Sequence, residues 1–145
     1  MRRLGVRVDF NQGTDARLYD EERAEIMARV PWLSSGVRMA CDTDAMIPHC
    51  IKAMRLLRKF GFKKDFRIYV LARAEAIESA INRIGALTAA DKRANPFVMP
   101  YRDMAKADDK VPEELRHLAN WCNRVWIRKS CKFSEYKTNR RPREA

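Results

Sequence analysis

Residues 37–42 decide the fold, because Val37-Arg-Met-Ala-Cys-Asp42 alternates apolar and polar side chains with the period of a β-strand. The apolar residues that follow are spaced as one face of a helix, at Ile47, Ile51 and Met54. Asp44 is placed to cap that helix, Pro48 is tolerated in its first turn, and Gly61 is typical of a helix end. This stretch therefore predicts one strand followed by one helix.

The same unit recurs on both sides of this stretch. Strands are predicted where short runs alternate or are rich in β-branched and aromatic residues, at 5–11, 37–42, 66–71 and 97–101. Helices are predicted between Asp20 and Pro31, after Asp44, around residues 77–84, and from Pro112 through Val125. We expect residues 88–95 to form an irregular connection before the fourth strand.

Strands that alternate with helices at this spacing indicate a parallel sheet, so the predicted fold class is α/β. Pro100 indicates that the last strand is an edge strand or is close to its end. One face of the predicted strands is polar and carries Arg7, Asp9, Asn11, Arg38, Asp42, Arg67, Tyr69 and Arg73. Such a sheet is covered by helices on one side only. Its second face is either an open surface or the inner wall of a barrel that holds a polar ligand.

The 145-residue chain has a formal net charge of +11, and the excess is concentrated near its C-terminal end. Residues 116–145 hold nine basic and two acidic side chains. This charge favours an anionic partner such as a nucleic acid bound through the basic C-terminus, an acidic protein or a phosphate-rich substrate, and a solubilising tail is the alternative. Trp121, Trp126 and Phe133 lie in the same region, where they fit a stacking surface or packed core, and core is the expectation.

The cysteines show no CxxC spacing and stand at Cys41, Cys50, Cys122 and Cys131. They predict buried free thiols and no metal site. His49 and His117 are expected to be surface or packing residues. The sequence shows neither a secretory signal nor a run of about 20 apolar residues that would span a membrane. We therefore expect a soluble, cytoplasmic protein without a membrane partner.

One stretch carries most of the functional information, Asp9-Phe-Asn-Gln-Gly-Thr-Asp-Ala-Arg-Leu18. It places two amides and a flexible turn after the first predicted strand, at the end where α/β proteins bind ligands. The stretch closely resembles the DFNQGLDARL segment of a group of bacterial radical S-adenosylmethionine (radical SAM) proteins. Further segments that resemble this group follow in order, and together they extend the similarity over about residues 4–137: 37–42, 69–71, 96–101 and 121–136.

The resemblance implies a partial (βα)4 segment, equivalent to strands three to six of the family's (βα)6 partial TIM barrel, with an extra C-terminal helix and a basic tail. Residues 1–111 would form the barrel segment, residues 112–136 a helical extension of the same domain, and residues 137–145 a disordered tail. In this family a CxxxCxxC loop binds a 4Fe–4S cluster, whose open iron binds S-adenosylmethionine and cleaves it to a 5′-deoxyadenosyl radical. The cofactor-binding residues implied here are Asn11, Gln12, Asp15, Asp42, Tyr69 and Arg73, and no catalytic residue is assigned.

The chain also departs from the family pattern. It contains no CxxxCxxC, position 14 is Thr where the group has Leu, and the predicted connection at 88–95 is longer than the family's turn. The cluster would have to come from a separately encoded N-terminal half, so this chain alone is not expected to be catalytic. An apolar sheet edge where the missing strands belong would favour self-association. Two alternatives stay open, a basic nucleic-acid-binding module and a truncated remnant without function.

Overall fold

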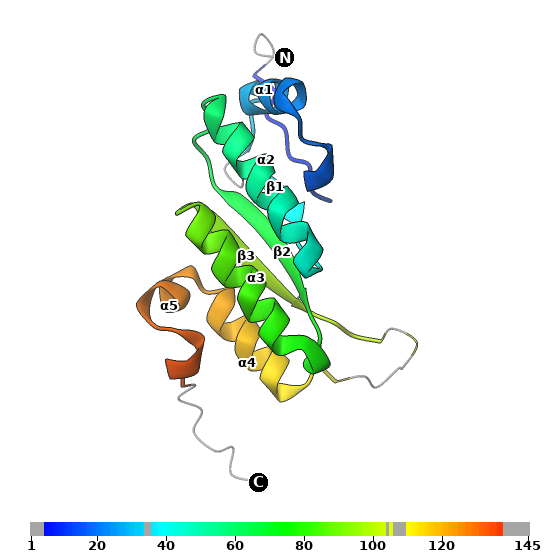
Figure 1. Ribbon diagram of the computed structural model, residues 1–145, viewed down its shortest axis with the longest axis vertical. Coiled ribbons are helices and arrows are strands. Elements are labelled where there is room, and N and C mark those ends of the chain that lie inside the picture. Colours follow the sequence, from blue (N-terminus) through cyan, green and yellow to red (C-terminus); the bar gives the residue numbers. More distant parts are fainter. Residues whose placement is uncertain (1–4, 34–35, 104, 106–109, 138–145) are drawn as a thin grey trace.

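The computed structural model describes residues 5–33, 36–103, 105 and 110–137. Within these residues the chain is an α/β protein with one parallel sheet, which confirms the predicted class. The strands lie side by side in sequence order, β1 (Val37–Ala40), β2 (Phe66–Ala72) and β3 (Ala94–Pro100). The α-helices are α1 (Glu21–Arg29), α2 (Ile47–Lys59), α3 (Ile77–Ala90), α4 (Glu113–Cys122) and α5 (Val125–Ser130). Figure 1 shows α2, α3 and α4 in a row over one face of the sheet.

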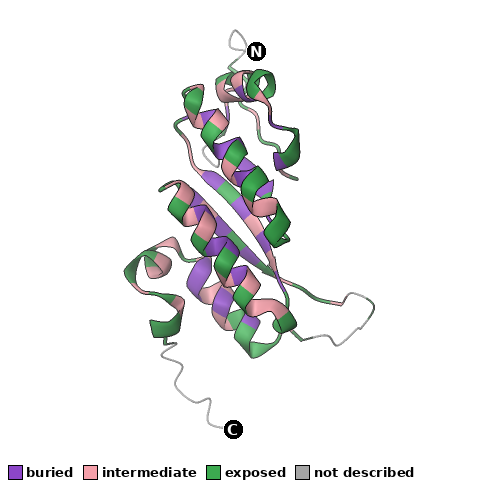
Figure 2. Ribbon diagram, in the orientation of Figure 1, coloured by how far each residue is buried: buried purple, intermediate pink, exposed green. Residues whose placement is uncertain are grey.

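The core lies between this row of helices and the sheet. Phe66, Ile68 and Val70 alternate along β2 and are fully buried, whereas Arg67 between them is exposed. The large apolar side chains that meet the strands from the helices are Met54, Leu57, Ile84, Leu87, Leu115 and Leu118. Figure 2 shows the resulting band of buried residues along the strands and along the helix sides that face them. The sheet is thus covered by helices on one face, as the polar alternation predicts.

Local chemistry sets the helix ends. Asp20 caps α1 as predicted, since its Oδ1 accepts the backbone N–H three residues further on at 2.8 Å. Pro48 is the second residue of α2, and Gly61 follows the helix in the left-handed conformation with φ +85°. The predicted cap at Asp44 is wrong, because Asp44 lies inside the 3₁₀ turn before α2. Its Oδ1 instead accepts a hydrogen bond from the Ser79 hydroxyl at 2.8 Å.

The strand predicted at residues 5–11 does not form, so the sheet has three described strands rather than four. Val8 pairs with the loop that follows α1 through two backbone hydrogen bonds of 2.9 Å. Only Thr14 reaches the edge of β1, where its N–H donates to the Arg38 carbonyl at 2.8 Å. The alternating side chains of this segment indicate an extended backbone, but they do not specify which neighbour it pairs with.

The irregular connection predicted at residues 88–95 is also wrong. The helix α3 continues to Ala90 and β3 already begins at Ala94, so a three-residue turn joins them. Thr88 stays helical because its hydroxyl donates to the Ile84 carbonyl at 2.8 Å, one turn earlier in the same helix. This connection is therefore short and regular on both sides.

The helix predicted from Pro112 through Val125 is interrupted. The helix α4 ends at Cys122 and α5 begins at Val125, because Arg124 adopts an extended backbone with ψ 95°. The residue next to it, Asn123, is bound to the neighbouring strand through its side chain. The aromatic and basic residues that follow therefore belong to a separate, short helix.

Side chains satisfy the outer edge of β3, which is the edge strand that Pro100 predicts. The Asn123 amide pairs with the backbone of Val98, since Oδ1 accepts its N–H at 2.6 Å and Nδ2 donates to its carbonyl at 3.0 Å. Arg128 donates to the Pro96 carbonyl at 3.2 Å. Pro96 and Pro100 have no backbone N–H that could pair with a further strand. We call this arrangement the sealed edge.

The opposite edge of the sheet is covered far less. Among the described residues, the outer edge of β1 receives hydrogen bonds from the N–H and the hydroxyl of Thr14 at the Arg38 carbonyl and from the Cys50 thiol at the Ala40 carbonyl, the last at 3.4 Å. In the described part of the chain no helix is both long and apolar enough to cross a membrane. The basic tail predicted for residues 137–145 lies outside the described residues beyond Lys137.

Candidate functional site

A pocket of about 410 Å³ lies on the uncovered face of the sheet, at the carboxyl ends of β1 and β2. Its lining residues are Asn11, Gln12, Ala40, Asp42, Tyr69, Leu71 and Met99. A second hollow of about 380 Å³ adjoins it, because Gln12, Ala40 and Asp42 line both, and Asp15 lines the second one. Five of the six residues implied by the resemblance therefore gather at one end of the sheet.

Arg38 positions Asn11 at this site. Arg38 is 9% exposed, and its Nη1 donates to Asp9 Oδ1 at 2.6 Å and to Asn11 Oδ1 at 3.2 Å. A buried guanidinium needs such a partner, because an unpaired charge away from water is costly. Its Nε has no hydrogen-bond partner among the described residues. The sequence places Arg38 on the polar strand face, but it gives no sign that this side chain joins the two ends of the Asp9–Asn11 segment.

The turn after Asn11 brings the segment close to β1. Gly13 has φ +86°, and a Cβ at this position would lie 3.4 Å from the Arg38 carbonyl oxygen. The Thr14 hydroxyl donates to the same carbonyl at 3.0 Å and lies 3.0 Å from the buried Tyr19 hydroxyl. Burial raises the pKa of Tyr19. Thr14, where the radical SAM group has Leu, thus holds the loop against the sheet.

Asp15 is held by its own turn. Its Oδ1 accepts the Arg17 backbone N–H at 2.9 Å, and the Arg17 guanidinium donates to both carboxylate oxygens at 2.7 to 3.2 Å. These hydrogen bonds to Arg17 lower the pKa of Asp15 to about 2, so the group is charged at neutral pH. Asp15 is an acceptor at the rim of the second hollow, and its charge is already paired.

Asp42 and Tyr69 both line the pocket of about 410 Å³. Asp42 follows β1, and its Oδ1 accepts the Leu71 backbone N–H at 3.2 Å. Its Oδ2 has no hydrogen-bond partner among the described residues and remains available as an acceptor. Tyr69 faces Phe97 across the β2–β3 ladder, with the two rings edge to face and 6.0 Å between their centroids. The pocket therefore combines an aromatic ring, a carboxylate and two amides.

Arg73 does not line either hollow. Its guanidinium stacks 3.8 Å from the centre of the Tyr101 ring, and it lies 3.9 Å from a Glu75 carboxylate oxygen. Both contacts turn it toward the connection after β2 and away from Asn11 and Asp42. The structure thus brings together five of the implied cofactor-binding residues and separates the sixth from them.

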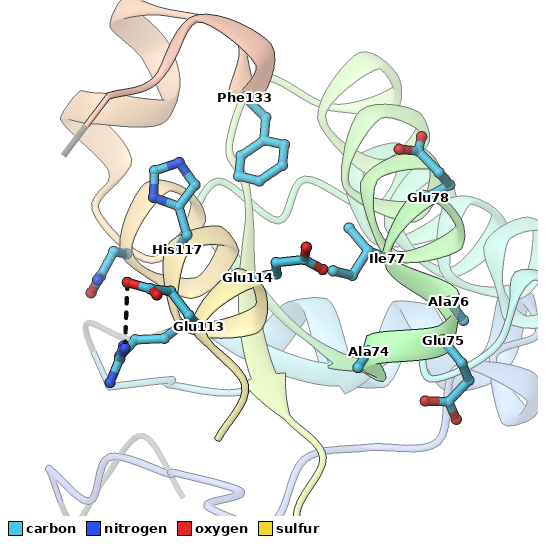
Figure 3. Close-up of a pocket in the computed structure, with 11 residues that line it drawn as sticks. Ala74, Glu75, Ala76, Ile77, Glu78, Glu113, Glu114, His117 and Phe133 are labelled. Atoms are coloured by element: carbon cyan, nitrogen blue, oxygen red, sulfur yellow. Dashed lines mark ion pairs between the residues drawn. The ribbon is translucent and has the colours of Figure 1, made fainter. Parts of the chain in front are cut away.

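A larger pocket of about 720 Å³ lies on the helical side of the molecule, between the start of α3 and α4. Figure 3 shows that its carboxylates do not converge, since Glu75 and Glu78 point to opposite sides while Glu114 extends toward Ile77. Glu113 is paired with Arg116 at 3.7 Å. Among the described residues there is no group of three or more His, Cys, Asp or Glu side chains that could hold a metal ion.

The cysteines lie on the helix-covered side of the sheet. Cys41 and Cys50 are fully buried, and a hydrogen bond between their thiols lowers the pKa of Cys41 and raises that of Cys50. Cys122 is also buried, Cys131 is half-buried, and all four are free. This confirms the predicted free thiols and places them where they cannot contribute to the pocket on the opposite face.

The remaining sequence predictions concern isolated rings. His49 is exposed and His117 is stacked on Tyr136 with 4.7 Å between ring centroids, so both are surface or packing residues as predicted. Trp121 is buried as core, 5.5 Å from Phe133. The expectation of core is wrong for Trp126, which is 72% exposed because the break after α4 turns α5 outward.

Comparisons of this chain with family models, with curated proteins and with solved structures found no match. Its function is therefore inferred from the residues and the geometry described above.

Proposed function

We propose that the chain is a segment of a nucleoside-binding α/β barrel, with its ligand held at the carboxyl ends of the strands. The pocket lined by Asn11, Gln12, Asp42 and Tyr69 carries this proposal. Parallel strands in sequence order, with their helices on one face, are the arrangement of a βα barrel wall. Doubly wound sheets instead carry helices on both faces. Ligand sites in barrels lie at the strand ends where this pocket lies.

The particular ligand that we propose is S-adenosylmethionine, bound by a radical SAM-type barrel of which this chain is one part. The support is the sequence resemblance together with the position of its residues. The stretch Asp9–Leu18 and the residue Asp42 come from different units of the chain, yet they line adjoining hollows. A volume of about 410 Å³ also falls within the usual range for small-molecule sites.

The pocket residues fit the chemical groups of this ligand. The Tyr69 ring would stack against the adenine, and Asp42 Oδ2 would accept hydrogen bonds from ribose hydroxyls. The amides of Asn11 and Gln12 would bind the amino and carboxylate groups, with Asn11 oriented by Arg38. When it is bound, S-adenosylmethionine supplies a radical once a reduced cluster donates an electron to it.

The cysteines of this chain do not fit the cluster itself. Cys41 and Cys50 pack against each other inside the core, and Cys122 bonds to the Pro96 carbonyl behind β3. None of them lines the pocket. In the proposal, the cluster is therefore bound by a part of the barrel that these 145 residues do not include, and the residues described contribute the nucleoside side of the site.

Isothermal titration of the full chain with S-adenosylmethionine and S-adenosylhomocysteine tests the proposal. Asp42→Asn leaves the fold intact and weakens an acceptor for the ribose, so we expect affinity to fall about tenfold, as for loss of a hydrogen bond to a charged group. Glu22→Gln on α1 removes an equivalent charge away from the pocket and should bind as the unsubstituted chain does. A folded chain that binds neither nucleoside, or an Asp42→Asn variant with unchanged affinity, would contradict the proposal.

A further inference from the structure

The exposed indole of Trp126 is not used by the site on the sheet. Trp126 is 72% exposed, whereas Trp32 and Trp121 are 3% and 7% exposed. The helix that carries it is fixed, because Arg128 on the same helix donates to the Cys122 carbonyl at 2.7 Å and to the Pro96 carbonyl at 3.2 Å. The fixed helix therefore holds a large apolar ring in solvent, where a ligand can contact it.

Three cations lie near Trp126 in the sequence. Lys129 lies one helical turn beyond Trp126 on the same face of α5, Arg124 precedes the helix, and Lys132 follows it. All three are exposed, and none has an ion-pair partner among the described residues. The acidic residue in the segment, Glu135, accepts the Lys132 backbone N–H through its carboxylate. The surface around the indole is therefore positive.

A groove of about 700 Å³ adjoins this surface, between α3 and residues 128–135. Its lining includes the ammonium groups of Lys129 and Lys132 and the hydroxyl of Ser134, whereas the hydroxyls of Thr88 and Ser130 already donate to backbone carbonyls of their own helices. Glu78 and Glu135 also line it, so its charge is mixed at the rim. Lys129 belongs both to the face of Trp126 and to the groove, which makes the two features one continuous surface. We call it the α5 surface.

We infer that the α5 surface binds single-stranded nucleic acid, with a base stacked on Trp126 and phosphates contacted by Lys129, Lys132 and Arg124. Stacking on an exposed aromatic residue beside a basic groove is how single strands are bound without reading their sequence. A duplex keeps its bases inside and offers no free ring to the indole. The charge complementarity of three unpaired cations favours this occupant over a protein surface. This inference does not depend on the site on the sheet.

Intrinsic fluorescence and anisotropy test this inference with the full chain and a fluorescein-labelled 12-nucleotide oligo(dT). Among the three tryptophans only Trp126 is accessible, so a stacked base should quench the part of the emission that acrylamide also quenches. Trp126→Ala should weaken oligo(dT) binding about tenfold, as expected for the loss of one stacked base. The pair Lys129→Ala and Lys132→Ala should lower the salt slope of log Kd by about 1.4, which is about 0.7 for each phosphate contact with a single strand.

A matched control removes equal charge elsewhere. Lys52→Ala with Arg55→Ala takes two exposed cations from α2, and this variant should bind oligo(dT) as the unsubstituted chain does. Equal affinity for the matching duplex, unchanged affinity in the Trp126→Ala variant, or no oligo(dT) binding by a folded chain at low salt would each overturn the inference.

Discussion

Arg38 illustrates how one residue couples the fold to the candidate site. Its backbone lies in β1, its carbonyl accepts both donors of Thr14, and its guanidinium holds Asp9 and Asn11. The segment that fails to become a strand is thus bound to the sheet through side chains rather than through a backbone ladder. Alternation in the sequence identifies which residues face the polar side, but the partner of a buried Arg lies 27 to 29 residues away in the chain.

A second residue-scale property is the acid sensitivity contributed by Asp15. Hydrogen bonds from Arg17 lower the pKa of Asp15 from 3.8 to about 2 in the folded chain. A carboxyl whose folded pKa is depressed contributes stability that is present above its unfolded pKa and is lost as pH falls through its folded pKa. We therefore expect Asp15→Asn to flatten the decline in stability between about pH 4 and pH 2, measured by urea unfolding across that range.

The control for this experiment removes a carboxylate that, among the described residues, does not accept hydrogen bonds of the kind that Asp15 accepts from Arg17. Glu22→Gln on α1 neutralises an exposed carboxylate and should leave the acid slope between pH 4 and pH 2 unchanged. The slope that Asp20 and Asp91 contribute remains in both variants, because hydrogen bonds also lower the pKa of each of these groups. A slope in Asp15→Asn equal to that of the unsubstituted chain would refute the assignment.

At the scale of the elements, the sequence predicts what is local and fails where the partner is distant. Residues 37–42 and 66–71 are correctly predicted as strands because both combine alternation with flanking turn residues. Residues 5–11 have the same alternation, but the loop after α1 takes the place of a strand beside them. The break between α4 and α5 depends on the side chain of Asn123, which binds a strand 25 residues earlier. No local pattern reveals that contact.

The candidate site follows the same rule. Asp42 follows β1 and Tyr69 lies within β2, and neighbouring parallel strands bring such positions together, whereas Asn11 and Gln12 reach the same pocket from a loop that forms no strand. Arg73 lies one residue beyond β2, where its contact with Tyr101 directs it elsewhere. Position along a strand is therefore predictable, whereas the direction of a long side chain after the strand ends is set by tertiary contacts.

The sealed edge allows a prediction at this scale. Asn123→Ala removes two hydrogen bonds from Val98 and leaves its backbone N–H and carbonyl unpaired at the edge of β3. We expect the free energy of unfolding to fall by about 2 kcal/mol, because unsatisfied buried polar groups cost roughly 1–3 kcal/mol each. The exposed edge should also promote association, which sedimentation velocity would detect as a shift toward larger species.

The matched control for the sealed edge is Asn82→Ala, which changes the same residue type at an exposed position of α3. This variant should keep both the urea midpoint and the sedimentation profile of the unsubstituted chain. If Asn123→Ala had the same urea midpoint and the same sedimentation profile as this control, the Asn123 amide would have no role in protecting the edge of β3.

At the scale of the whole molecule, the helices cover one face of the sheet and the proposed ligand site occupies the other. The four cysteines lie with the helices, in the core or beside it. We therefore expect anaerobic reconstitution of this chain with iron and sulfide to yield no stoichiometric 4Fe–4S absorption. A stoichiometric cluster on these residues alone would disprove the proposal that the cluster is bound outside them. Cys41→Ser with Cys50→Ser tests whether any adventitious iron depends on the core thiols.

Because of the sealed edge, further strands can be added to the sheet beside β1 but not beside β3. New strand–helix units fused after β3 would meet Asn123, Arg128 and two prolines instead of a free ladder, whereas units fused before residue 5 would meet the sparsely bonded side of β1. An engineer who wished to enlarge this protein toward a closed barrel would therefore extend it from its N-terminal side. The side chains of Asn123 and Arg128 thus already end the sheet at the outer edge of β3.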